Sequence, residues 1–188
     1  MNRPHRALRT ALSYAIPSSG WNARPETPGH WIDDAARWRA DVYACNDECG
    51  VALEAQDGPI NDGIVRRSEA FLAHDVWPLW VFLRRIPVEH AKDAVLVSTD
   101  IARIPGILEA LARSPSPRGL SWVDAQKPMR AAFAAAAPVA PKYPGLFEEA
   151  RKKLERAAAI GALKSSRTAA YRRGWKDGWA AAAQAEPA

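Results

Sequence analysis

Two cysteines, Cys45 and Cys49, and two histidines, His74 and His90, are the residues whose types best suit metal chemistry. Zinc is held in proteins by four thiolate, imidazole or carboxylate ligands in tetrahedral geometry. The four residues supply that number, although the histidines are scattered along the chain. A metal-dependent enzyme with a zinc site at these residues is therefore one hypothesis. The other is that the cysteines are buried, unreactive thiols on an apolar helix face.

Acidic residues offer a second kind of metal chemistry. Asp33, Asp34 and Asp41, together with Asp47 and Glu48, carry the carboxylate oxygens that divalent cations prefer. They fall mainly at the start of a predicted helix, where the helix dipole favours acids for structural reasons alone. The sequence contains no P-loop, no nucleophile elbow and no His-Glu-x-x-His motif. We therefore expect binding rather than catalysis, with no catalytic residue and no cofactor, zinc being the alternative.

The stretch from Tyr43 to His74 is similar to the start of competence-type nuclease proteins, in which a short cysteine pair precedes a Phe-Ala-His string. Here Cys45 and Cys49 precede Phe71-Leu72-Ala73-His74. The cysteine spacing is one residue wider in this chain, and no carboxylate–lysine motif of a nuclease follows. Because the similarity covers only about thirty residues, we do not assign the chain to that family.

Positive charge is concentrated near the C-terminus. Residues 142–179 carry ten Lys or Arg and four Asp or Glu, whereas the rest of the chain carries sixteen and seventeen. Three aromatic residues recur every four positions and form one stripe of a predicted helix, with cations beside them. Such cations contact phosphates, and the rings stack on bases or pack on a neighbouring helix. The predicted nucleic-acid or partner-binding residues are Arg167, Tyr171, Arg172, Arg173, Trp175, Lys176 and Trp179.

The elements that position these residues follow from apolar spacing and from turn residues. A helix beginning near His30 would place Cys45 and Cys49 on the same face as two tryptophans. Residues 51–55 and 64–72 are predicted to form a β-hairpin across a long, turn-rich loop.

Further along the chain, residues 77–83 are predicted as a helix capped by Asp75, and their apolar character places them at the centre of the core. Residues 94–98 are predicted as a buried strand, and residues 101–113 and 121–137 as helices. Thr99 or Asp100 is the expected cap of the first of these helices.

A proline-rich stretch, residues 138–145, predicts a stiff linker between two parts of the chain. The body before it covers residues 1–137. The segment after it, residues 146–188, is predicted to form two helices, over 146–160 and about 165–183. Two glutamates in the first helix lie four residues before lysines, an order that favours i,i+4 ion pairs.

The predicted fold class is α+β and mostly α-helical, with a small β-hairpin or sheet in the body and a basic αα-hairpin at the C-terminus. A chain of 188 residues with 48% hydrophobic residues and eight tryptophans can bury a real core. Two cysteines make no disulfide framework, which favours the cytoplasm. No run of about eighteen apolar residues occurs, so we expect no membrane partner.

The predicted function is a small non-catalytic binding or regulatory accessory protein, of the kind that a phage or plasmid carries. Its basic, aromatic C-terminal helix would contact nucleic acid or an acidic, nucleic-acid-handling protein. A pI near 9.5 fits such anionic partners. The alternatives are an inhibitor or adaptor that binds proteins through a Trp-rich surface, the zinc enzyme above, and self-association into a homo-oligomer.

Overall fold

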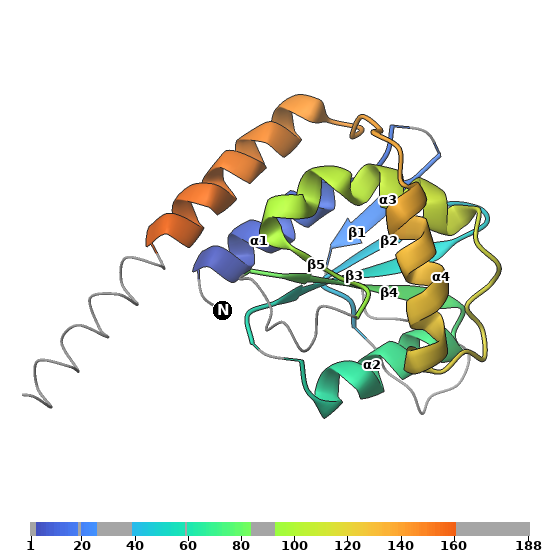
Figure 1. The fold of residues 1–188 in the computed structure, drawn as a ribbon. Coiled ribbons are helices and arrows are strands. Elements are labelled where there is room, and N and C mark those ends of the chain that lie inside the picture. Colours follow the sequence, from blue (N-terminus) through green and yellow to red (C-terminus); the bar gives the residue numbers. More distant parts are fainter. Residues whose placement is uncertain (1–2, 19, 26–38, 59, 84–92, 161–188) are drawn as a thin grey trace, which may run out of the picture.

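The computed structural model describes residues 3–18, 20–25, 39–58, 60–83 and 93–160. Within these ranges the chain forms a mixed five-stranded sheet with helices on both faces (Figure 1), so the α+β expectation is confirmed. The strands are β1 Asn22–Pro25, β2 Val42–Cys45, β3 Gly50–Gln56, β4 Val76–Phe82 and β5 Val95–Val97. The helices are α1 Arg3–Tyr14, α2 Asp62–Ala73, the 3-10 helix η2 Ser98–Arg103, α3 Ile104–Ala112, α4 Trp122–Ala135 and a helix over 144–160.

The strands lie in the order of the chain, β1-β2-β3-β4-β5. The first three form an antiparallel meander, and β3, β4 and β5 are parallel to one another. Helix α2 connects β3 to β4, as a parallel pair requires a long crossover connection. The carboxyl ends of the three parallel strands therefore lie at one end of the sheet, where α/β proteins commonly bind their ligands.

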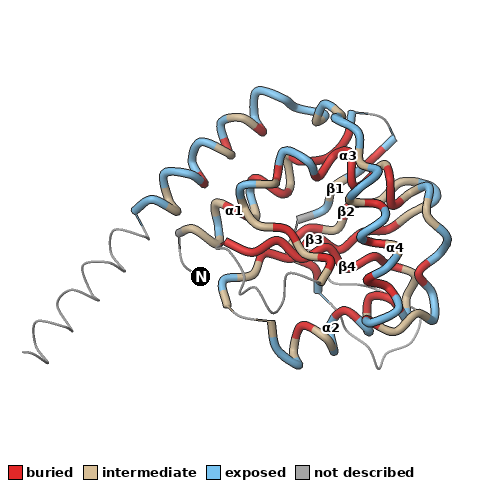
Figure 2. The backbone as a smooth tube through the Cα atoms, viewed as in Figure 1, coloured by how far each residue is buried: buried red, intermediate tan, exposed pale blue. Residues whose placement is uncertain are grey.

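The sheet is the middle layer of the molecule. Helices α1 and α3 lie on one side of it and α2 on the other (Figure 1), and Figure 2 shows the buried residues gathered along the strands and the inner helix faces. Three residues of the helix over 144–160, Phe147, Ala150 and Leu154, belong to the same buried cluster as Leu8 and Leu53. The beginning of the basic segment thus packs into the core of the body.

The run around Trp77 forms strand β4, so the predicted helix and its Asp75 cap are wrong. Its expected place in the core is confirmed, because every residue of β4 is buried. Strands on both sides and helices on both faces surround β4, which removes the polar alternation that marks a half-exposed strand. Asp75 instead adopts a left-handed turn, with φ 65°, between α2 and β4.

Two further element predictions are wrong. Cys45 ends β2 and Cys49 lies in the following turn, so the two thiols do not share a helix face. Residues 64–72 belong to α2, which begins after Asn61, and the predicted hairpin therefore consists of one strand and one helix. The Asn61 side chain accepts hydrogen bonds from the backbone N–H groups of Gly63 and Ile64, which fixes the start of the helix.

Several predictions in the second half of the chain are confirmed. Strand β5 and helices α3 and α4 lie within the ranges expected, although Arg103 rather than Thr99 or Asp100 is the N-cap of α3. The helix over 144–160 is also present, and one of its expected i,i+4 ion pairs joins Lys152 to Glu148 at 3.7 Å. The predicted second tail helix lies outside the described residues. No helix in the described ranges is both long and apolar enough to cross a membrane.

Candidate functional site

Two carboxylates, Asp41 and Glu54, meet where β2 begins and β3 ends. Strands β2 and β3 pair Val42 with Leu53, and extending this register by one residue places Asp41 opposite Glu54. The Asp41 Oδ2 atom accepts a hydrogen bond of 2.9 Å from the backbone N–H of Ala55. The Asp41 carboxylate is therefore held against the carboxyl end of β3, at the end of the sheet that favours ligand binding.

Glu54 is a buried acid that follows the apolar residues Val51–Leu53 in β3, with 1% of its side chain exposed. Its Oε2 atom accepts a hydrogen bond of 2.5 Å from the Arg67 guanidinium of α2. Arg67 also donates to the Arg39 carbonyl oxygen at 3.1 Å, and its Cζ atom lies 5.3 Å from the ring centroid of Trp80. This cation–π contact and the two hydrogen bonds fix the guanidinium over the carboxylate.

The second oxygen of the Glu54 carboxylate is not satisfied. Glu54 Oε1 is buried and has no hydrogen-bond partner among the residues that the structure describes. Burial raises the pKa of Glu54 to about 8, and the nearby Asp41 carboxylate adds to the rise. The Arg67 guanidinium and the backbone N–H of Asp41 oppose this rise, but their effect is smaller. A buried acceptor without a partner is costly in a folded protein, so this atom marks a place where a ligand would be stabilising.

His5 of α1 contributes a third polar side chain. Its Nε2 atom lies 3.0 Å from the Ala55 carbonyl oxygen and 3.9 Å from Asp41 Oδ2. Because a carbonyl oxygen can only accept, Nε2 carries the proton in the shorter contact. The Ala55 carbonyl and the Asp41 carboxylate thus lie close to one and the same imidazole nitrogen. Together with Glu54 they bring three oxygen-bearing groups to one end of the sheet.

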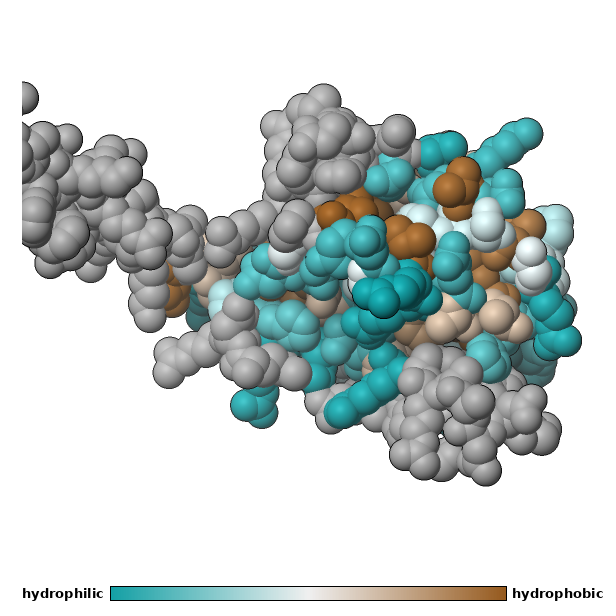
Figure 3. Space-filling model, turned by 90° about the horizontal axis from the view of Figure 1, so that it is seen from below, coloured by the Kyte–Doolittle hydropathy of each residue, from teal (hydrophilic) through white to brown (hydrophobic). Residues whose placement is uncertain are grey.

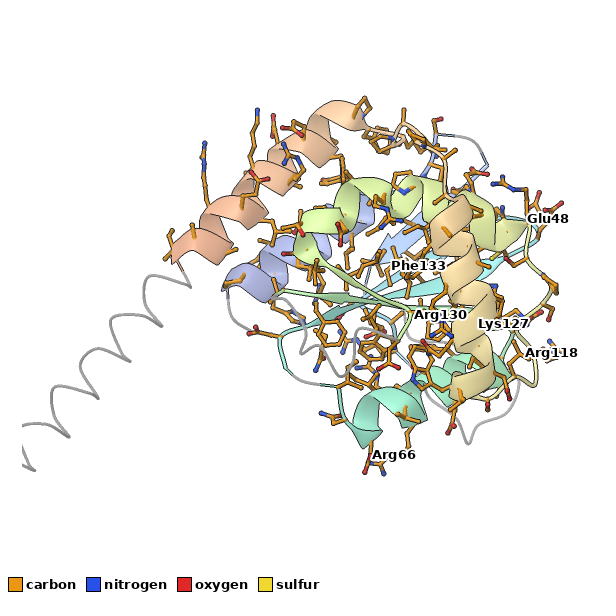
Figure 4. The ribbon with its side chains drawn as sticks, viewed as in Figure 1. Glu48, Arg66, Arg118, Lys127, Arg130 and Phe133 are labelled. Carbon is orange, nitrogen blue, oxygen red and sulfur yellow. The ribbon has the colours of Figure 1, made fainter. Side chains whose placement is uncertain are left out.

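Among the described residues, hydrophilic side chains gather over the middle of the surface in the view from below, with hydrophobic ones beside them (Figure 3). Arg66 projects from α2 away from the sheet (Figure 4), next in sequence to Arg67, which turns inward to Glu54. Two neighbouring arginines on one helix thus have different roles. Arg66 points into solvent, whereas Arg67 forms an ion pair with the buried Glu54 carboxylate.

The four residues proposed for zinc are only partly within the described chain, because His90 lies outside it. The side chains of Cys45 and Cys49 are free thiols and half-buried. His74 Nδ1 lies 2.8 Å from the Ala70 carbonyl oxygen of its own helix. Among the described residues, no group of three or more His, Cys, Asp or Glu side chains is arranged to hold a metal ion.

The environment of Cys49 opposes thiolate formation. Burial raises the pKa of the Cys49 thiol to about 12, and the nearby Asp75 and Cys45 side chains contribute in the same direction. Zinc binds cysteine as thiolate, so zinc binding would have to remove a proton that Cys49 holds more tightly than an ordinary cysteine does.

The seven residues predicted to contact nucleic acid or a partner lie outside the described residues: Arg167, Tyr171, Arg172, Arg173, Trp175, Lys176 and Trp179. From the sequence, Asp41 is an acid suited to a divalent cation, but it is predicted to lie on a helix. Glu54, Arg67 and His5 are not predicted as site residues. The available signal was Glu54 itself, since an acid inside the apolar run Val51–Ala55 is almost always paired or functional.

Comparisons with family models, with curated proteins and with solved structures found no match to this chain.

Proposed function

We propose that the protein is a divalent-cation-dependent hydrolase of phosphodiester bonds in nucleic acid, with Asp41 and Glu54 as the cation ligands. One observation carries the proposal. The buried Glu54 Oε1 atom has no hydrogen-bond partner among the described residues, and its carboxylate lies beside a second one. Glu54 lies near the carboxyl end of the parallel strand β3, and Asp41 precedes the antiparallel strand β2 beside it. Two adjacent carboxylates repel each other, so a cation between them would be stabilising.

The donor set suits Mg²⁺ or Mn²⁺ better than zinc. These cations take oxygen ligands, and Mg²⁺ is commonly bound through one or two carboxylates together with substrate phosphates and water. When bound at Asp41 and Glu54, the cation would polarise a phosphoryl oxygen of the substrate. The chain's own groups hold the oxygens in place, with Arg67 on one oxygen of Glu54 and His5 on the Ala55 carbonyl.

Nucleic acid is the phosphodiester that fits the charge of this chain. Residues 142–179 hold six more positive than negative residues, and the chain has no acid before Glu26. Phosphate backbones are bound mainly through Lys and Arg, with release of counterions. In the proposal the C-terminal cations Arg167, Arg172, Arg173 and Lys176 contact phosphates, and Tyr171, Trp175 and Trp179 anchor the segment or stack on bases.

The alternative is the non-catalytic role expected from the tail alone, in which the protein binds nucleic acid or a nucleic-acid-handling protein without cleaving it. The charge concentration favours it as strongly as it favours the hydrolase. Charge reversal at Arg172, Arg173 and Lys176 would abolish binding in both cases. Salt separates a phosphate partner from a protein partner, because phosphate contacts weaken by orders of magnitude as salt rises and aromatic-anchored protein contacts lose much less.

Cleavage of labelled DNA and RNA by the full chain, with Mg²⁺ or Mn²⁺ and with a chelator, tests the catalytic proposal. We expect cleavage that requires the cation and falls at least about a hundredfold in Glu54→Gln and in Asp41→Asn. Glu48→Gln is the same substitution at an exposed residue in the β2–β3 turn (Figure 4) and should leave cleavage intact. Cleavage that survives in Glu54→Gln, or a cation-loaded wild type that binds but never cleaves, would refute the hydrolase.

A further inference from the structure

A groove of about 370 Å³ lies at the opposite end of α1 from His5. It is formed where the end of α1, the start of β1 and the chain just before the helix over 144–160 come together. Its volume falls in the range of small-ligand sites in proteins, about 300–1,000 Å³. Residues that line it include Ser13, Tyr14, Trp21, Asn22, Lys142 and Tyr143.

The groove is held open by fixed contacts rather than by loose side chains. Pro17 and Pro141 form an isolated antiparallel bridge, and the Lys142 N–H donates to the Ile16 carbonyl oxygen at 2.7 Å. Trp21, which is 2% exposed, donates from Nε1 to Glu109 Oε1 at 3.2 Å. The two walls are thus joined to each other, and the indole is fixed to α3.

The lining combines an aromatic surface with polar groups of the kind that recognise a nucleotide. Tyr143, which is 52% exposed, and the half-buried Tyr14 both line the groove. Aromatic rings of this kind stack on unpaired bases of any sequence. Lys142 supplies a cation for a phosphate, and the Asn22 amide both donates and accepts hydrogen bonds.

Helix α1 joins this groove to the carboxylate pair. His5, Arg9 and Ser13 recur every four residues and therefore form one ridge of the helix. His5 contacts the Ala55 carbonyl at one end, and Ser13 lines the groove at the other. At 1.5 Å per residue the ridge spans about 12 Å. The helix contains three arginines and no acid.

We propose that the groove binds an unpaired nucleobase of a nucleic-acid strand whose backbone follows α1 to Asp41 and Glu54. The choice of nucleic acid as ligand rests on the proposed function, whereas the groove and its aromatic lining do not. The protein would therefore prefer single strands, or duplexes with unpaired ends, because a paired base cannot enter the groove.

Binding of labelled oligothymidylate to the full chain, followed by fluorescence anisotropy, tests this site. The chain carries Glu54→Gln so that no strand is cut. Tyr143→Ala should weaken single-strand binding about tenfold, the loss expected for one stacked base, while Tyr143→Phe should bind like the parent. Lys142→Gln should weaken binding, and Lys127→Gln, the same change on α4 (Figure 4), should not. Binding of a blunt duplex should be unaffected by Tyr143→Ala.

Equal single-strand binding by Tyr143→Ala and Tyr143→Phe would overturn the proposal. An equal loss of duplex binding and single-strand binding in Tyr143→Ala would also overturn it. Tyr143 is exposed enough that its removal should leave the fold intact, and circular dichroism checks this. Failure here is distinguishable from failure of the proposed function. A wild type that cleaves while the Tyr143 variants bind normally refutes the groove alone. Strand binding that depends on Tyr143, together with a wild type that does not cleave in the presence of the cation, refutes the hydrolase alone.

Discussion

The Nη2 atom of Arg67 lies 2.5 Å from Oε2 of Glu54, and the two side chains differ sharply in burial, 50% of the arginine and 1% of the glutamate being exposed. The ion pair therefore links the interior of the sheet to solvent through a single arginine. It compensates one carboxylate oxygen and leaves the other, Oε1, without a partner among the described residues. This half-compensated carboxylate is the feature from which the candidate site is built.

Removal of the arginine should destabilise the fold through Glu54. We expect Arg67→Met to lower the free energy of unfolding by about 1–3 kcal/mol, because a buried carboxyl then loses its partner. Arg66→Met, the same change on the neighbouring solvent-facing residue, should cost less than about 0.5 kcal/mol. Urea unfolding measures both. In the double variant Glu54→Gln/Arg67→Met the loss should be smaller than the sum of the single losses, and strict additivity would contradict the coupling.

The raised pKa of Glu54 predicts how stability varies with pH. Since the folded-state pKa of about 8 lies above the ordinary value of 4.5, the folded protein binds the proton more tightly than the unfolded chain. The stabilisation of the fold that results from this tighter proton binding is fully present below about pH 4.5 and is lost as pH rises through about 8. Cation-free wild type should therefore lose stability over this window relative to Glu54→Gln. A difference between the two that grows in favour of the wild type as pH rises would contradict the assignment.

Cys49 should react slowly with thiol reagents. Burial raises its pKa to about 12, so almost no thiolate exists at neutral pH. In a Cys45→Ala variant, iodoacetamide should modify the remaining thiol at least about tenfold more slowly than a free cysteine. The unfolded chain in urea gives the reference rate. Equal rates in the folded and unfolded chains would show that the thiol is more accessible and more acidic than its surroundings indicate.

Gly106 should tolerate no side chain. A Cβ atom at this position of α3 would lie 1.9 Å from the backbone oxygen of Ala137, and backbone cannot move aside as a flexible side chain does. Gly106→Ala should therefore cost about 1–3 kcal/mol or more in thermal or urea unfolding. Gly145→Ala is the matched control, because nothing lies within 4 Å of its Cβ position and it sits in the first turn of a helix. Equal stability of the two variants would contradict the close approach.

The sequence predicted the core more reliably than the elements that form it. The run around Trp77 was expected at the centre of the core and is buried there, but as a strand. Pro78 within the run favoured the first turn of a helix, since proline is rare in central strands. The parallel pairing of Ala52 with Pro78 overrides that preference. Burial on both faces makes a strand and a buried helix look alike in sequence.

The candidate site could be predicted only in part, because its residues meet through tertiary structure. Asp41 and Glu54 are thirteen positions apart and become neighbours through the pairing of β2 with β3. His5 comes from a different layer of the fold, and no local spacing relates it to either acid. Residue types alone singled out Asp41. In a carboxylate–lysine motif a lysine would stand two residues after Glu54, where this chain has Gln56. The strongest sequence signal for a site at Glu54 is therefore missing.

Calorimetric titration of Mn²⁺ into the full chain, above about pH 8 so that Glu54 is ionised, tests the central claim most directly. We expect saturable binding by the wild type and by Glu48→Gln, and loss of binding in both Glu54→Gln and Asp41→Asn. Wild-type binding that persists unchanged in Glu54→Gln, or a wild type that binds no cation, would contradict a divalent-cation site at these two carboxylates.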